Sequence, residues 1–218
     1  MPNDSEFQLG VLRALLDLFS RPSGPVLEDY DVDTPQASGS EEAWSCVIPL
    51  PPLDEAQDPR EALKQSLTLE VTSLMPWYQE SGRVNGRTTF GLSGLAADDI
   101  PSIASFIGDI ASGNDSKVPQ PLADRMTDGV RYLFDDVKAF YMEAAAAQPG
   151  AHPPGGARMW EWFYHETRMG QALYDVRDQL RAEYDSKTKE NGGVRPAGPA
   201  PVNPIPQTYD ARLNKSNK

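Results

Sequence analysis

The chain has 218 residues, of which 39% are apolar and 24% are charged, and its one cysteine is Cys46. Its formal net charge of −12 at pH 7 argues against nucleic-acid binding and against binding to anionic lipid. One cysteine excludes an intrachain disulfide and a thiolate metal cluster built from this chain alone, so we expect a reducing, cytoplasmic setting.

The charge is distributed unevenly along the chain. From Lys187 onward there are six basic residues and two acids, a net charge of +4, whereas the first 186 residues carry −16. The 20 prolines and 17 glycines are typical of a folded body with substantial irregular segments. We divide the chain into residues 1–21, 22–58, 59–185 and 186–218.

Residues 1–21 are predicted to form an amphipathic helix. Arg13 and Asp17 interrupt its apolar run, and neither a basic start nor a cleavage site is present, so we expect no signal peptide and no membrane insertion. Such a helix can either pack on the core or bind another subunit. Its apolar residues recur at spacings of four, four and three: Phe7, Val11, Leu15 and Leu18.

Residues 22–58 are acidic and rich in proline. They contain no lysine or arginine, and the sequence PLPP at residues 49–52 favours an extended backbone. An acidic loop could hold Ca²⁺, but the D-x-D-x-D-G spacing with a distal glutamate is missing. We therefore expect an extended acidic segment. Its nine acids are Glu28, Asp29, Asp31, Asp33, Glu41, Glu42, Asp54, Glu55 and Asp58.

The next helix is predicted to begin at Pro59 and to end near Met75. Asp58 can cap its N-terminus, and Glu61 follows three residues later, as in a capping box. Pro76 is expected to end the helix because proline lacks the N–H group that continues the helical hydrogen bonds. The expected buried stripe consists of Leu63, Leu67, Val71 and Leu74.

Glycine, threonine and serine dominate residues 86–94, GRTTFGLSG. Backbone N–H groups and hydroxyls ahead of a helix can cradle a phosphate, so Arg87, Thr88, Thr89 and Ser93 are candidates for binding the anionic group of a cofactor. The spacing matches neither common glycine-rich phosphate motif, and a structural turn is the alternative. The sequence does not indicate which cofactor would bind.

Three more helices are predicted after this loop. One begins near Asp98 with Pro101 in its first turn, and the others span residues 121–147 and 157–184. A loop of roughly nine residues joins the last two, which favours an antiparallel hairpin. The apolar stripes of the three helices are Ile100, Ile103, Ile107 and Ile110; Leu122, Met126, Val130, Leu133, Val137, Phe140 and Ala144; and Met159, Trp162, Met169, Leu173, Val176 and Leu180.

A carboxylate, Glu166, falls on the predicted stripe of the last helix. Gly170 lies one turn further on, where a missing side chain would leave space beside that carboxylate. A buried carboxylate has to be protonated, paired or bound to a ligand, so Glu166 could act in a site with His165. The alternative is an ion pair at the helix interface. The basic side chains that could form it are Arg131, Lys138 and Arg158.

The helix at residues 121–147 offers Asp136 and Glu143, which are seven residues apart and therefore on one side. In an antiparallel hairpin they would face Glu166 and His165, and these four residues are the candidate catalytic group. A di-iron bundle needs a pair of Glu-x-x-His motifs, which the chain lacks. We assign no metal to the group.

Residues 186–218 are predicted to form a flexible basic tail, because lysine, asparagine, glycine and proline cannot build a core. The fold class expected is all-α, with about five helices, a long C-terminal antiparallel hairpin, an extended acidic N-terminal segment and a disordered C-terminal tail.

The first functional hypothesis is a non-catalytic accessory or interaction subunit that docks on a larger protein assembly. The alternative is a small helical enzyme or cofactor-binding protein with a buried carboxylate and histidine site.

Overall fold

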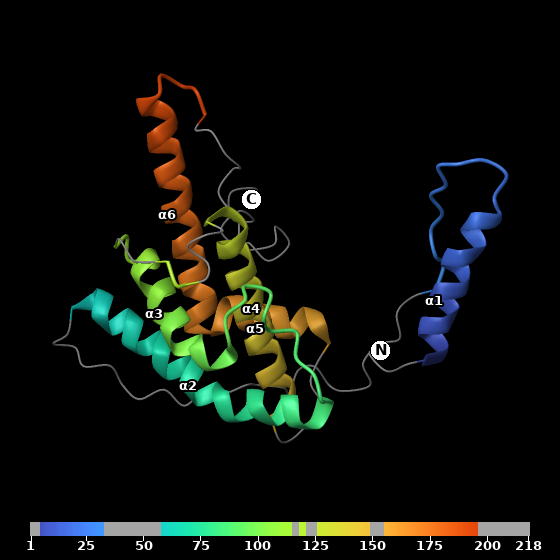
Figure 1. The fold of residues 1–218 in the computed structure, drawn as a ribbon, viewed down its shortest axis with the longest axis horizontal. Coiled ribbons are helices and arrows are strands. Elements are labelled where there is room, and N and C mark those ends of the chain that lie inside the picture. Colours follow the sequence, from blue (N-terminus) through green and yellow to red (C-terminus); the bar gives the residue numbers. More distant parts are fainter. Residues whose placement is uncertain (1–4, 33–57, 115–117, 121–125, 149–154, 196–218) are drawn as a thin grey trace.

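The computed structural model describes residues 5–32, 58–114, 118–120, 126–148 and 155–195. This part of the chain is helical and contains no strand (Figure 1). None of its helices is long and apolar enough to span a lipid bilayer. The elements are α1 (Ser5–Asp17), the 3₁₀ turn η1 (Leu18–Ser20), α2 (Pro59–Asn85), the 3₁₀ turn η3 (Ala97–Asp99), α3 (Ile100–Ala111), α4 (Met126–Ala146), α5 (Gly156–Glu166) and α6 (Arg168–Glu190).

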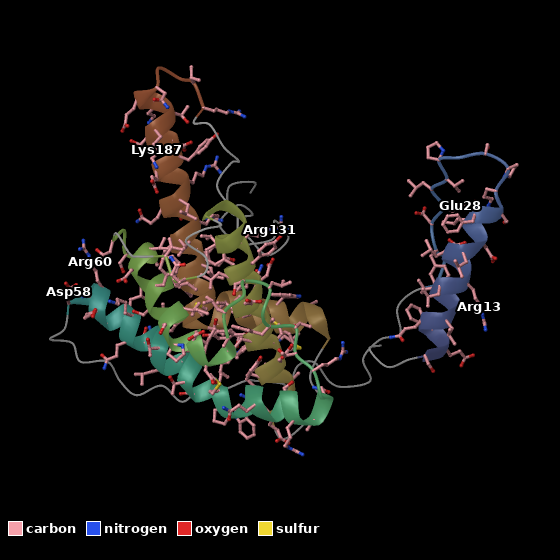
Figure 2. All side chains as sticks on the ribbon, viewed as in Figure 1. Arg13, Glu28, Asp58, Arg60, Arg131 and Lys187 are labelled. Atoms are coloured by element: carbon pink, nitrogen blue, oxygen red, sulfur yellow. The ribbon has the colours of Figure 1, made fainter. Side chains whose placement is uncertain are left out.

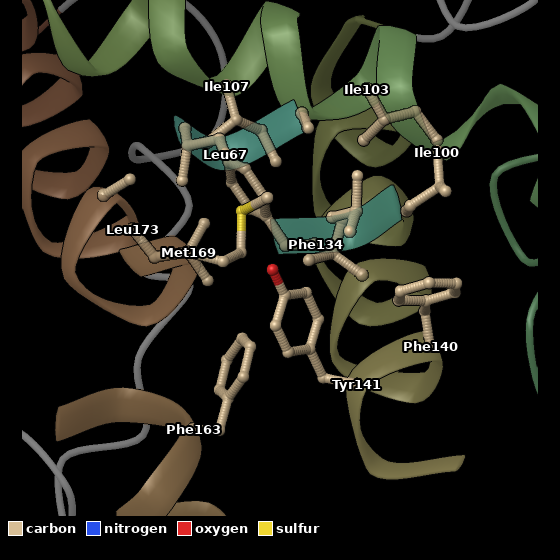
Figure 3. Close-up of a cluster of buried hydrophobic side chains, with 14 of the residues drawn as sticks. Leu67, Ile100, Ile103, Ile107, Phe134, Phe140, Tyr141, Phe163, Met169 and Leu173 are labelled. Atoms are coloured by element: carbon tan, nitrogen blue, oxygen red, sulfur yellow. The ribbon is translucent and has the colours of Figure 1, made fainter. Parts of the chain in front are cut away.

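Helix α2 contacts α3, α4 and α6 and so holds the body together. It begins as predicted, with the Asp58 carboxylate accepting a hydrogen bond from the Arg60 N–H at 3.0 Å (Figure 2). Its apolar stripe meets stripes from the other four body helices in one aromatic and aliphatic core (Figure 3). The core residues labelled in Figure 3 are Leu67, Ile100, Ile103, Ile107, Phe134, Phe140, Tyr141, Phe163, Met169 and Leu173.

Pro76 does not end the second predicted helix, and that prediction is wrong. Helix α2 runs through Pro76 to Asn85, although the proline removes the hydrogen bond to the Thr72 carbonyl. Packing outweighs this loss, because Tyr78 and Ser81 beyond the proline are buried. The axis of α2 changes direction along its length (Figure 1), as is usual for a helix with an internal proline.

The last predicted helix, residues 157–184, is in fact two helices. Helix α5 ends at Glu166 and α6 begins at Arg168, with Thr167 between them in extended backbone (φ −96°, ψ 153°). The expected hairpin of two long helices is therefore not confirmed: α4 packs chiefly on α2, and α6 packs chiefly on α3. Helix α6 also continues to Glu190, beyond the boundary expected at residue 185.

The N-terminal helix forms close to where the sequence predicts it. None of the residues of α1 or η1 is buried, so this helix adds nothing to the core of the body. Most of the acidic segment, residues 33–57, lies outside the described residues, as do residues 196–218 of the predicted tail.

Candidate functional site

Glu166 is not a buried seam carboxylate, and the prediction that placed it there is wrong. It is the last residue of α5, its side chain is 43% exposed, and it forms an ion pair with Arg158 at 2.6 Å. Helix α5 ends at this residue, so the single continuous stripe predicted from Trp162 through Glu166 to Met169 does not form. Arg158 is one of the three basic partners considered for the alternative ion pair, but the pair joins two residues of α5 at the surface and not two helices at their interface.

The break between α5 and α6 is fixed by local hydrogen bonds. The Thr167 hydroxyl donates to the Phe163 carbonyl at 2.6 Å and accepts from the Gly170 N–H at 2.9 Å, which caps α6. A Cβ atom on Gly170 would lie 1.9 Å from the Phe163 carbonyl oxygen. Gly170 therefore leaves no space for a ligand. It allows the two helices to meet.

His165 also lies outside any enclosed site. It is exposed, and its ring stacks on Tyr174 with 6.3 Å between the ring centroids. The four predicted catalytic residues are thus divided: Glu166 and His165 are on the surface at the end of α5, whereas Asp136 and Glu143 contact the loop at residues 88–93.

Asp136 is fully buried on α4, beneath the glycine-rich loop. One carboxylate oxygen accepts the N–H groups of Gly91 and Leu92, both at 2.9 Å. The other accepts the N–H of Ser93 at 2.9 Å and its hydroxyl at 2.5 Å. Gly91 has φ of 124°, a backbone conformation that glycine adopts readily and that helps to turn consecutive N–H groups toward one anion.

Glu143 lies two turns further along α4 and binds the start of the same loop. Its Oε2 accepts the Thr88 hydroxyl at 2.8 Å, and its Oε1 accepts the Thr89 N–H at 2.6 Å and hydroxyl at 2.7 Å. We call residues 88–93 together with Asp136 and Glu143 the carboxylate clasp. Arg87, immediately before it, is exposed.

The clasp joins residues that were predicted to belong to two separate sites, the anion-binding loop and the catalytic group. Thr88, Thr89 and Ser93 were candidates for holding the anion of a cofactor, and the anions they contact are the chain's own carboxylates. Asp136 accepts four hydrogen bonds, about as many as a carboxylate can. This geometry fastens the loop to α4 and leaves Asp136 little capacity to bind a metal or a substrate.

A second buried carboxylate, Glu70 of α2, was missed by the sequence reasoning. It accepts the Tyr141 hydroxyl at 2.7 Å and the N–H groups of Arg168 and Met169 at 2.8 and 3.0 Å. It therefore sits at the N-terminus of α6, where a negative charge is favoured. Burial raises the pKa of Glu70, and the hydrogen bonds oppose that rise.

The signal for Glu70 was in the sequence. The residue lies three after Leu67 and four before Leu74, which is the spacing that drew attention to Glu166. Among the described residues, no group of three or more histidine, cysteine, aspartate or glutamate side chains could hold a metal ion. Nor does that part of the chain contain a buried side-chain nitrogen or oxygen atom without a hydrogen-bond partner.

The most distinctive surface feature of the described chain is an apolar stripe on α1 and η1. Its members recur at steps of three, four and three and therefore share one face. Leu16 is 63% exposed and Phe19 is 84% exposed. We call this set the α1 stripe: Leu9, Leu12, Leu16 and Phe19.

The opposite face of α1 is partly covered by the residues that follow it. Arg21 and Glu28 form a bidentate ion pair, with both distances 2.7 Å, that closes the returning segment. The Tyr30 hydroxyl comes within 3.1 Å of where a Cβ would stand on Gly10. The half-buried residues of α1 and η1 lie on this face: Phe7, Gly10, Ala14 and Leu18.

A scan against protein-family models finds no match for the chain, and searches of curated proteins and of solved structures find none either.

Proposed function

We propose that the protein is a non-catalytic interaction subunit that attaches to a larger protein assembly through α1. The observation that carries this proposal is the α1 stripe: four large apolar side chains on one face of a helix, all exposed. An amphipathic helix that lays anchors at positions i, i+3, i+7 and i+10 into a groove is a common mode of recognition between proteins. The helix-in-groove geometry fits this stripe.

The alternative, an enzyme or cofactor-binding protein, gains less support from the same geometry. Asp136, Glu143, Thr88, Thr89 and Ser93 bond to one another. Glu166 pairs with Arg158 at the surface, and Glu70 caps α6. Each of these carboxylates has a structural partner, whereas the α1 stripe has none among the described residues that would bury it.

Site-specific photo-crosslinking tests the proposal in cells that produce the protein. A photoreactive phenylalanine analogue replaces Leu16 on the stripe or, as the control, Asp17 on the polar side of the same helix. We expect a discrete crosslinked product from position 16 and little from position 17. Co-purification under native conditions should recover the same partner.

A matched pair of variants separates binding from folding. Leu12→Gln with Leu16→Gln keeps residues that favour helix and should abolish co-purification. Leu27→Gln, at a leucine that is 96% exposed outside the stripe, should leave it intact. A chain that stays monomeric and gives no crosslink from position 16 in its own cells would overturn the proposal.

A further inference from the structure

The negative charge of the chain is concentrated in the N-terminal part of its sequence. Residues 1–58 contain twelve acids and two arginines, a net charge of −10 out of −12 for the whole chain. The remaining 160 residues carry 20 acids and 18 basic residues, a net charge of −2. The first quarter of the chain thus holds almost all of its excess charge.

The described residues show how this charge is arranged. One of the two arginines, Arg21, is taken up by its ion pair with Glu28, which leaves Arg13 as the basic group of the segment 5–32 outside that pair. The acids of the same segment that lie outside it are all exposed. They are Glu6, Asp17, Asp29 and Asp31. With five acids and two arginines, the described segment that carries the α1 stripe has a net charge of −3.

From this surface we infer that the partner of α1 is a protein with an apolar groove bordered by lysine and arginine side chains. The inference rests on the proposed function and adds the chemistry of the partner. The groove would receive Leu12 and Leu16 near the middle of the α1 stripe. The lysine and arginine side chains of the border would be attracted by the net negative charge of residues 5–32, to which Asp29 and Asp31 contribute. Opposite charges of this kind speed association and exclude wrong partners.

Other occupants fit this surface less well. Nucleic acid and anionic lipid would be repelled by a charge of −10, and helices that lie on membranes carry a polar face rich in lysine and arginine, unlike that of α1. A second copy would bring the same acidic segment, with a net charge of −3 over residues 5–32, to the contact. The chain's own tail, residues 196–218, is basic, but a single extended peptide cannot enclose a convex ridge as a groove does.

Two synthetic peptides test the inference with the full-length chain. Both are helical hairpins with the same leucine-lined groove between their two helices, flanked by lysines in one and by glutamates in the other. Binding is followed by fluorescence anisotropy of the labelled peptide. At low salt we expect the lysine peptide to bind at least about tenfold more tightly, and this advantage should shrink at about 1 M salt, where the Debye length falls to about 3 Å.

Variants of the chain locate the binding surface. Leu12→Gln with Leu16→Gln should abolish binding of the lysine peptide. Asp29→Asn with Asp31→Asn should weaken it several-fold, while Asp185→Asn with Glu161→Gln, which removes two exposed charges from the body, should leave it unchanged. The partner crosslinked from position 16 should carry lysine or arginine around the crosslinked site.

Failure of the inference can be told apart from failure of the proposed function. If both peptides bind equally and both need Leu12 and Leu16, the basic border is wrong and the docking function stands. If neither peptide binds and position 16 gives no crosslink, docking itself is wrong.

Three further results would overturn the choice of a basic protein as the occupant. Dimerisation that Leu12→Gln with Leu16→Gln abolishes would assign the stripe to a second copy. Tighter peptide binding after removal of residues 196–218 would assign it to the chain's own tail. Binding to phosphatidylcholine vesicles through the same leucines would assign it to a lipid surface.

Discussion

Helices α1 and α3 are of nearly equal length, 13 and 12 residues, and both are rich in aliphatic side chains, yet they contribute differently to the fold. Seven residues of α3 are buried, whereas none of α1 is. Helix α3 lies against α2 and α6, which cover its isoleucines. Apolar content therefore does not by itself make a core helix. An opposing surface is also required, and we propose that for α1 this surface belongs to another protein.

Substitution of one buried and one exposed aliphatic residue tests this difference most strongly. Ile107→Ala in α3 should lower the free energy of unfolding by about 4 kcal/mol, because the residue is fully buried and the change leaves a cavity. Leu16→Ala in α1 should change it by less than about 0.5 kcal/mol. Urea unfolding of both variants measures the two effects, and similar losses would mean that α1 is part of the core.

The carboxylate clasp gives the next largest expected effect within the body. Asp136→Ala leaves three N–H groups and the Ser93 hydroxyl without their acceptor, so we expect a loss of about 3 kcal/mol. Asp135→Ala, which breaks only an ion pair with Lys138 at 2.7 Å, should cost less than about 1 kcal/mol. Comparable losses for these neighbouring aspartates in chemical denaturation would contradict a structural role for the clasp.

Two glycines, one in a crowded position and one in an open position, should respond in opposite ways to substitution by alanine. Gly170→Ala should destabilise the protein by about 2 kcal/mol, since its Cβ would overlap the Phe163 carbonyl. Gly82→Ala in α2, where a Cβ meets nothing within 4 Å, should stabilise it by up to about 1 kcal/mol. Thermal unfolding should therefore shift in opposite directions for the two variants.

Glu70 gives the smallest effect and one that depends on pH. Burial raises the pKa of Glu70, so between its ordinary and raised values the folded state binds more protons than the unfolded state. Stability from this group is complete at low pH and is lost as pH rises through the folded pKa. Glu70→Gln removes that dependence and should change stability by less than about 1 kcal/mol at pH 4.

The measurement is the free energy of unfolding of wild type and Glu70→Gln at several pH values from 4 to 7. The variant should gain stability relative to wild type as pH rises, and a relative loss would mean that the hydrogen bonds from Tyr141, Arg168 and Met169 outweigh burial. For the double variant Leu12→Gln with Leu16→Gln, the difference in free energy of unfolding from wild type should not change with pH.

Several features follow from the sequence alone because they depend on neighbours within a few turns. The helical class, the cap formed by Asp58, and the burial of Leu67, Ile103 and Val137 on their predicted stripes are observed as predicted. Hydrophobic periodicity encodes which face of a helix is apolar. It does not encode what covers that face, which is why the exposed state of α1 was left open.

The tertiary structure decided the rest. Packing carried α2 through Pro76, and the close approach of Phe163 to Gly170 accompanies the division of the last helix that places Glu166 on the surface. Asp136 and Ser93 are 43 residues apart in the chain, and Glu70 and Met169 are 99 apart. The partner of a carboxylate depends on such distant contacts, which no local spacing specifies. The sequence alone identified the helical class and the apolar faces of the body helices. It assigned the apolar face of the N-terminal helix to Phe7, Val11, Leu15 and Leu18, whereas the exposed stripe is a different set, and only the assembled body determined which faces and charges were satisfied.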